Sequence, residues 1–385
     1  MTRVIDFNGV GTIPVQCISY EPDNNRFVVV ARPLDRISTP SETYRVYVRF
    51  PAPQKVDAPE DGCNIALFNP NHSESDVRMI RLSPLGSRTV GWLCTVTALA
   101  SNNHKYSSDP HFRRAAFMNA RHLLHSQIVW KRTSIQNDST VELVDIVDDN
   151  ASILTVFRPF VSSYAGTECT ELLPSLHRIG FVPFTPQSAA AWKPGTAALN
   201  EFNNGHEHLT LDPFPASEKY SEFIAEVFKD LLPPIPSSIL RFFIYYQIIE
   251  ALLDGVLLET RSKALRSMIA EWETSERIKS VIEKVQEASK GSSRMERLFS
   301  EYSDSDNKED LRLACNSLLI ACGIDEKPSA PEALYKVRNT LFHEMRSMTG
   351  RRLLRLDNVN NELQVVVPDL LLNFSLIERE VSYQI

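Results

Sequence analysis

The spacing of apolar residues changes at Ser217, and this change limits what the chain can fold into. Before it, apolar segments such as 26–34 and 43–53 are short, rich in β-branched and aromatic residues, and separated by turn-forming clusters, which is typical of strands. After it, apolar residues recur with the period of a helix, first over 217–232. The sequence therefore predicts an α+β protein, with a β-rich part followed by a helical part.

We place a domain boundary at this change. Residues 1–216 are expected to form a β-rich or mixed domain, with one helix over 111–129. The stretch 165–216 is rich in Pro, Gly, Asn and Thr, so we expect it to consist mainly of loops. Residues 217–385 are expected to form an antiparallel helical bundle.

The helical pattern of the second domain is interrupted at recognisable places. The predicted helices span residues 217–232, 238–259, 261–289, 295–302, 311–322 and 331–348. The acidic residues 303–310 are expected to form a loop. Residues 351–367 contain the turn-forming run Asp-Asn-Val-Asn-Asn, which predicts a small β-hairpin, and Pro368 is expected to open a last helix.

Composition narrows the class of protein. Hydrophobic residues make up 43% of the 385 residues and charged residues 23%, with a net charge of -7, so any contact with RNA must come from a local basic patch. The most apolar stretch, 239–258, carries Arg241, Glu250 and Asp254, which favours a buried helix over a membrane span. The six cysteines lack metal-binding or disulfide spacing, and no signal peptide is visible, so we expect a cytoplasmic protein without a membrane partner.

The segment 331–348 predicts an amphipathic helix with clear ends. Ser329 and Pro331 are a favourable start, and Thr349-Gly350 is a favourable stop. At about 100° per residue, one narrow apolar stripe should face the bundle core. The stripe comprises Leu334, Val337, Leu341, Met345 and Met348.

The opposite side of this helix gathers polar side chains. Asn339, His343 and Arg346 are expected to face outward, while Arg338 lies beside the apolar stripe. The long arginine side chain can run along the edge of the core and still present its guanidinium group to solvent near His343.

The run Arg338-Asn339-x-x-x-His343 resembles the signature of HEPN-domain ribonucleases, and is nearest to the Apea-like HEPN subgroup. The similarity covers about residues 218–385 and nothing before them, and Glu344 departs slightly from the subgroup pattern. The resemblance implies a metal-independent endoribonuclease that leaves 2′,3′-cyclic phosphate ends. It also implies a homodimer in which two motifs face one cleft, and a role in antiviral defence or in a toxin-like system of growth arrest.

The chemistry of this cleavage suits the three residues. Histidine can act as acid or base near neutral pH, and arginine can stabilise the charge on the phosphorane. We therefore predict His343 as the acid/base, Arg338 as the group that stabilises the transition state, and Asn339 as a residue that assists them. Glu250 lies within the most apolar helix, and its position there has two interpretations. It is either a partner that orients Arg338 or a residue at the surface of the bundle.

A group of basic residues around the motif predicts a path for an RNA backbone, although a solvated charged face explains it equally well. Its members are Lys336, Arg346, Arg351, Arg352 and Arg355. The pairs His122/His125 and His206/His208 lack a third ligand at a suitable spacing, so we expect no metal and no cofactor.

The sequence is compatible with two functions. The first is the ribonuclease, whose domain 1–216 would sense a trigger, bind a regulatory partner or restrain the nuclease. The alternative is a non-catalytic HEPN-like module for dimerisation or for RNA or nucleotide binding within a larger complex.

Overall fold

The β-branched segments of the N-terminal part form two six-stranded sheets in the computed structural model. The structure describes residues 4–8, 10–33, 43–51, 63–69, 76–126, 130–131, 134–149, 151–157, 169–204, 207–214, 220–270, 279, 282–283, 286, 290–303 and 305–382. Its strands and helices confirm the predicted α+β class.

The first sheet has the strand order β8-β1-β2-β3-β4-β9. Its pairs are antiparallel except β1–β8 and β4–β9, which are parallel. Alternation along β4 buries Val46 and Val48 and leaves Arg45 and Arg49 exposed, as expected for a sheet with one solvated face. The strands are β1 (Val4–Phe7), β2 (Gly11–Glu21), β3 (Arg26–Ala31), β4 (Tyr44–Arg49), β8 (Ser134–Ile135) and β9 (Ser139–Val141).

The second sheet has the order β11-β5-β10-β7-β6-β12. Its centre depends on Gly91, because a Cβ atom there would lie 1.9 Å from the carbonyl oxygen of Thr155 on the neighbouring strand. The strands are β5 (Cys63–Asn69), β6 (Val77–Leu82), β7 (Thr89–Thr95), β10 (Ser152–Phe157), β11 (Val182–Pro183) and β12 (His208–Leu211). Short helices follow or separate strands: η1 (Pro22–Asn24), η2 (Ser83–Leu85), α1 (Val96–Leu99) and α3 (Leu143–Ile146).

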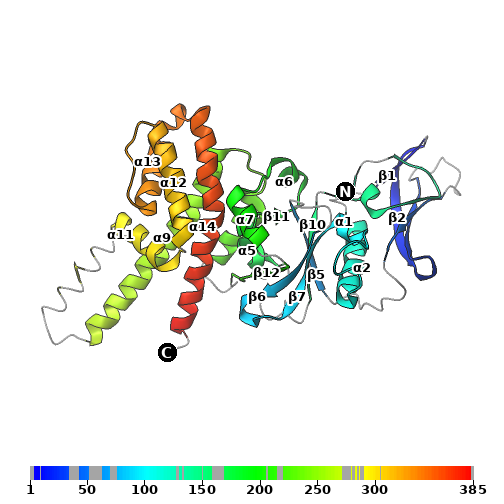
Figure 1. Cartoon of the computed structure of the whole chain (residues 1–385), viewed down its shortest axis with the longest axis horizontal. Helices are drawn as coiled ribbons and strands as arrows, with labels where there is room; N and C mark the ends of the chain where they lie inside the picture. Colours follow the sequence, from blue (N-terminus) through cyan, green and yellow to red (C-terminus); the bar gives the residue numbers. More distant parts are fainter. Residues whose placement is uncertain are drawn as a thin grey trace. The chain divides into compact units, whose positions relative to one another are not determined.

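Helix α2 (Pro110–His125) lies between the two sheets and joins their cores (Figure 1). Asp109 caps its first turn by accepting hydrogen bonds from the backbone of His111 and Phe112. The Phe112 ring packs on Trp92 of the second sheet, with centroids 5.4 Å apart, and Phe117 stacks on Phe27 of the first at 5.5 Å. The helix predicted over 111–129 is therefore present, but it ends at His125, because Ser126 has an extended backbone; residues 127–129 lie outside the described part.

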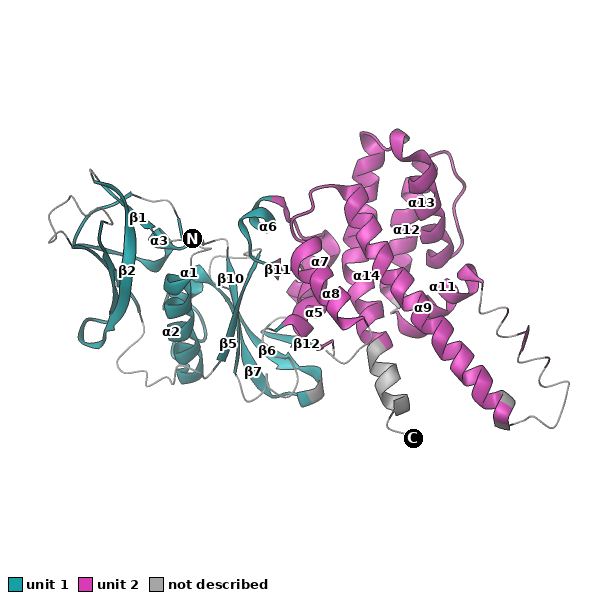
Figure 2. Cartoon of the chain, turned by 180° about the vertical axis from the view of Figure 1, so that it is seen from behind, with its two compact units in different colours: residues 1–169, 183–190, 205–211 teal, residues 170–182, 191–204, 212–385 magenta. Residues whose placement is uncertain are grey.

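The chain divides into two compact units, coloured separately in Figure 2. The first contains residues 1–169, 183–190 and 205–211, and the second contains residues 170–182, 191–204 and 212–385. The helical unit thus begins earlier than residue 217 and includes part of the stretch expected to be loops. That stretch contains η3 (Thr170–Leu172), α5 (Leu173–Arg178), α6 (Pro186–Ala191) and α7 (Thr196–Asn204).

The helical unit is organised around α14 (Arg351–Ser382), which packs against α5, α7, α9, α11 and α12. Buried Gln364 of α14 ties two segments to it, because its side chain accepts from the Gly195 amide at 2.9 Å and donates to the His177 carbonyl at 3.1 Å. The other elements are α8 (Ser221–Glu226), the π-helical turn η4 (Val227–Leu231), α9 (Ser238–Ala270), α11 (Gly291–Tyr302), α12 (Ser305–Ala321), α13 (Ala330–Glu344) and the 3-10 turn η5 (Met345–Ser347).

The predicted hairpin over 351–367 is wrong, since this segment is helical and Pro368 lies inside the helix instead of opening it. The turn-forming residues make tertiary contacts instead of a turn. Asp357 accepts a hydrogen bond from the Ser238 hydroxyl, and Asn360 donates to the Ser238 carbonyl at 2.8 Å, so both side chains hold the first turn of α9. The buried residues Leu356, Val359, Leu363, Val366 and Leu370 follow a helical period, and their burial outweighs the local turn preference.

Two other predicted boundaries are also wrong. The acidic stretch 303–310 is not a loop, because α12 begins at Ser305 and places Asp306 in its first turn, where the helix dipole favours a negative charge. Helix α9 continues to Ala270 without the expected break near residue 260, and most of 271–289 lies outside the described part. Among the helices that the structure describes, none is both long and apolar enough to cross a membrane.

Candidate functional site

Helix α13 carries the predicted motif and has the predicted start. The Ser329 hydroxyl accepts from the backbone of Glu332, and Pro331 occupies the first turn. Leu334, Val337 and Leu341 are fully buried, so this side of the helix faces the core as expected. The expected stripe also includes Met348, which is buried, and Met345, which is not.

The prediction for Met345 is wrong because the α-helix, predicted to reach residue 348, ends at Glu344. Helix α13 stops at Glu344, and Met345 begins the 3-10 turn η5. Met345 therefore lies outside the regular α-helix on which the stripe was predicted, in a turn with three residues per turn instead of 3.6, and it is 51% exposed.

Arg338 is held at the surface by an acidic partner from α9. Its Nη2 atom lies 3.5 Å from Oε1 of Glu250, and its Nη1 atom donates to Oδ1 of Asn339 at 3.1 Å. The second oxygen of Glu250 accepts from Nε2 of Gln247 at 2.8 Å. The contact between Glu250 and Arg338 that the sequence raised as one of two readings is therefore present, and it fixes the guanidinium group at the edge of the core.

Two aromatic rings flank this guanidinium group. Its Cζ atom lies 5.6 Å from the centroid of Tyr246 and 5.1 Å from the centroid of Phe342. Tyr246 is buried, and burial raises the pKa of its hydroxyl to about 12. Neither ring was predicted as part of the site from the sequence. The available signal for Phe342 was an aromatic residue outside the apolar stripe and next to His343.

His343 lies in the last turn of α13 and is exposed to solvent. The outward direction predicted for it is therefore the one observed. Asn339 lies one turn earlier on the same helix and is partly exposed. An imidazole, a carboxamide and a guanidinium group are thus open to solvent on α13, and these groups can exchange a proton, donate to a phosphate and balance its charge.

The five predicted RNA-binding residues differ in their surroundings. Arg352 donates from Nε to the Ala321 carbonyl at 3.1 Å, and Arg355 donates from Nη1 to the Ser317 carbonyl at 3.1 Å, so both hold the last turn of α12. Arg346 and Arg351 are exposed, and Lys336 is partly exposed. Arg352 and Arg355 therefore have a structural task that the sequence did not reveal.

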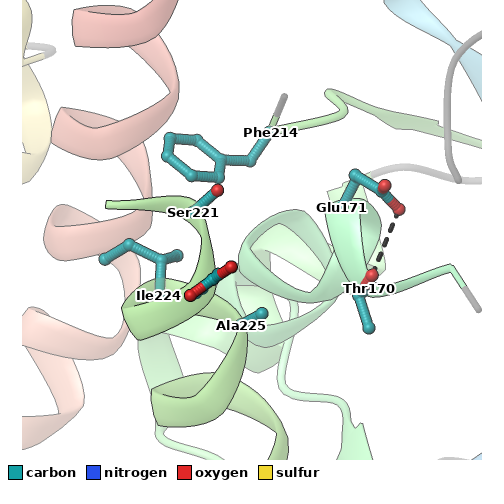
Figure 3. Close-up of a pocket in the computed structure, with 7 residues that line it drawn as sticks. Thr170, Glu171, Phe214, Ser221, Ile224 and Ala225 are labelled. Carbon is teal, nitrogen blue, oxygen red and sulfur yellow. Dashed lines mark hydrogen bonds between the residues drawn. The ribbon is translucent and has the colours of Figure 1, made fainter. Parts of the chain in front are cut away.

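A separate hollow of about 280 Å³ lies beside α8. Figure 3 shows Phe214, Ser221 and Ile224 on one side and Thr170 and Glu171 on the other, where the Thr170 hydroxyl donates to Glu171 at 3.3 Å. This volume is at the lower limit for a small-molecule site, and its lining includes none of the predicted site residues. We assign no function to it.

No protein-family model, no curated protein and no solved structure matches this chain. Within the described part of the chain, no three His, Cys, Asp or Glu side chains come together in a group that could hold a metal ion. The arrangement around Arg338 and His343 is therefore the feature of this chain from which a function can be inferred.

Proposed function

We propose that this chain is a metal-independent endoribonuclease of the HEPN type, acting in antiviral defence or in toxin-like growth arrest. The observation that carries the proposal is the ion pair between Arg338 and Glu250, which holds a guanidinium group at the surface on the same helix as the exposed His343. A surface arginine without a task loses little by remaining mobile, whereas a group that stabilises a transition state must be positioned in advance.

In this mechanism, one imidazole removes the proton of the 2′-hydroxyl, and that oxygen attacks the adjacent phosphorus. The bond to the 5′-oxygen breaks, and a second imidazole supplies the proton that the leaving oxygen takes up. Arg338 balances the charge that builds on the phosphorane, and the amide nitrogen of Asn339 donates to phosphate or imidazole. The products carry a 2′,3′-cyclic phosphate and a free 5′-hydroxyl.

The two imidazoles come from two copies of the chain. One chain supplies one motif histidine, and His343 points into solvent, where a second copy can bring its own His343 to the same phosphate. We therefore propose a homodimer as the active form. The N-terminal unit is proposed to sense a trigger or to bind a regulatory partner.

The test uses the full chain with total RNA and tRNA in the presence of EDTA. We expect wild type to cleave RNA, and His343→Ala and Arg338→Ala each to lower the rate at least about 100-fold. His111→Ala and Arg266→Ala replace exposed residues of the same types on α2 and α9 and should leave the rate unchanged. Cleavage that persists in both motif variants, or that stops with EDTA, would refute the proposal.

A second candidate is the non-catalytic module for dimerisation or RNA binding. The observation that favours it is exposed apolar surface: Phe342 in the motif is 65% exposed, and Leu240, which is 56% exposed, lies on α9 one turn before Phe243, which contacts Phe342. Growth arrest on overexpression that persists in His343→Ala, together with intact RNA, would support this module over the nuclease.

A further inference from the structure

Phe342 is an exposed aromatic ring that lies between Arg338 and His343 of the proposed active site in the sequence, and its ring centroid is 6.5 Å from that of His343. It follows Arg338 by four residues, which places it on the same side of α13, and it immediately precedes His343. With 65% of its surface exposed, it lies outside the buried stripe of this helix. A large ring in such a place contributes little to the core, so its position calls for another explanation.

The ring is supported from two sides and still open to solvent. Phe243 of α9 meets it at nearly a right angle, with centroids 6.0 Å apart, and the Arg338 guanidinium lies 5.1 Å from its centroid. Phe243 in turn contacts Phe242, whose side chain is fully buried. These contacts restrict the rotation of Phe342 and leave most of its surface available to a ligand.

We propose that Phe342 is a stacking platform for an unpaired nucleobase next to the phosphodiester that is cleaved. This inference rests on the proposed function and names its substrate class, which is single-stranded RNA or the loop of a folded RNA. A base paired within a duplex is covered by its stacked neighbours, whereas an unpaired base can leave the strand and lie on an aromatic ring.

The surroundings of the ring favour a nucleotide over a protein partner. Arg338 and His343 flank Phe342 and suit the phosphate of a nucleotide whose base lies on the ring. Exposed Arg346 adds a further positive charge on the following turn. An aromatic ring beside arginine side chains is the combination that binds single strands without strict sequence preference.

The experiment measures binding separately from cleavage. The full chain carrying His343→Ala, with EDTA present, is mixed with a short single-stranded RNA that contains 2-aminopurine, and both anisotropy and quenching of the base are recorded. We expect Phe342→Ala in this background to weaken binding about tenfold or more and to abolish the quenching. Phe342→Trp and Phe342→Tyr should retain both signals, because each keeps an aromatic face.

Two controls identify the cause of any loss. Phe342→Leu keeps an apolar side chain without a ring, so stacking predicts that it behaves like Phe342→Ala. Leu258→Ala replaces another exposed apolar residue, on α9, and should bind like the parent. The same RNA annealed to its complement should show no dependence on Phe342.

Three results would overturn the inference: unchanged RNA binding in Phe342→Ala, full binding in Phe342→Leu, or loss of the dimer in Phe342→Ala with unaltered quenching. The last result would assign the ring to an interface between copies. Cleavage that needs Arg338 and His343 but is indifferent to Phe342 would refute the platform and leave the nuclease standing. Quenching that depends on Phe342 in a chain that never cleaves RNA would support the stacking platform and refute the nuclease.

Discussion

Helix α9 holds two arginines from other helices through two glutamates, and the two contacts differ in kind. In its second half, Glu259 pairs with Arg297 of α11 at 3.2 Å, and Arg297 also binds both oxygens of Glu301, at 2.9 and 3.1 Å. Two turns earlier, Arg338 of α13 has one glutamate, Glu250, at 3.5 Å. The side chains of Arg297 and Arg338 are 23% and 32% exposed, so the two arginines are buried to a similar extent.

The difference lies in how fully each guanidinium group is neutralised. Arg297 faces two carboxylates and also donates to the hydroxyl of Thr260. Its strongest contact, with Glu301, raises its pKa. Arg338 is oriented by one longer contact and lies among aromatic rings, so part of its charge and of its donors remains for a ligand. A saturated arginine fastens two helices together, whereas an incompletely neutralised one is suited to bind an anion.

The largest expected effect separates the two arginines by activity. Arg338→Ala should lower RNA cleavage at least about 100-fold, since one group that stabilises developing charge is worth that much. Arg297→Ala should change cleavage by less than about threefold, because its donors are already occupied. Rates with saturating RNA and EDTA provide the measurement. Equal losses in the two variants would remove the distinction between them.

Measurements of stability should rank the two variants in the opposite order, with the larger loss in Arg297→Ala. Arg297→Ala removes one of three partners of the partly buried Glu259, which keeps Lys263 and the Tyr302 hydroxyl, and we expect a loss of about 1–2 kcal/mol in the free energy of unfolding. Arg338→Ala leaves only the half-exposed Glu250 and should cost less than about 1 kcal/mol. Urea denaturation of both variants gives the comparison, and a greater loss in Arg338→Ala would mean that this arginine is mainly structural.

Substitution of the two glutamates, Glu250 and Glu259, should also separate the two contacts by their effect on cleavage, with a smaller change in rate. Glu250→Gln removes the charge that orients Arg338, so it should lower the rate of RNA cleavage about tenfold. The folding of the protein should be unchanged. Glu259→Gln should leave cleavage unchanged. If Glu250→Gln cleaves at the wild-type rate, Asn339 and the aromatic rings are sufficient to position the guanidinium group.

Part of this arrangement was predictable from the sequence. The cap at Ser329 and the buried positions of Leu334 and Val337 follow from local rules that hold wherever a helix meets a core. Glu250 stood out as a carboxylate in an apolar helix, but the sequence left open whether it pairs with Arg338 or simply reaches the surface, and the structure shows a contact with Arg338 by a side chain that is 40% exposed.

Other parts depend on contacts that no local pattern contains. Asp357 and Asn360 look like turn residues, yet they bind Ser238, which lies more than a hundred positions away in the chain. In the sequence, Phe342 is an aromatic residue outside the apolar stripe, and its contact with Phe243 of α9 is visible only in the structure. In both cases the partner is set by tertiary packing, and packing overrides local preference.

The smallest effect concerns a carboxylate controlled by burial instead of by an arginine. Burial, with a contribution from the charge of Asp310, raises the pKa of Glu362 on α14 from 4.5 to about 7, whereas for Glu259 the Lys263 hydrogen bond and the Arg297 charge outweigh burial and lower the pKa. Between pH 4.5 and 7 the folded state holds a proton on Glu362 that the unfolded state has released, so stability falls as pH rises through this window and then levels off.

Glu362→Gln imitates the protonated form and should abolish this fall. At pH 8 we expect the variant to be more stable than wild type by about 1 kcal/mol, less than the full shift implies because water still reaches the carboxyl group. At pH 4.5 the two proteins should differ little, since wild-type Glu362 is then protonated in the folded state. Glu259→Gln should lower stability at pH 8, because Glu259 contributes only where it is ionised, and the opposite signs of the two variants in urea denaturation are the decisive measurement. Destabilisation by both variants at pH 8 would mean that Glu362 has a stabilising partner when it is ionised.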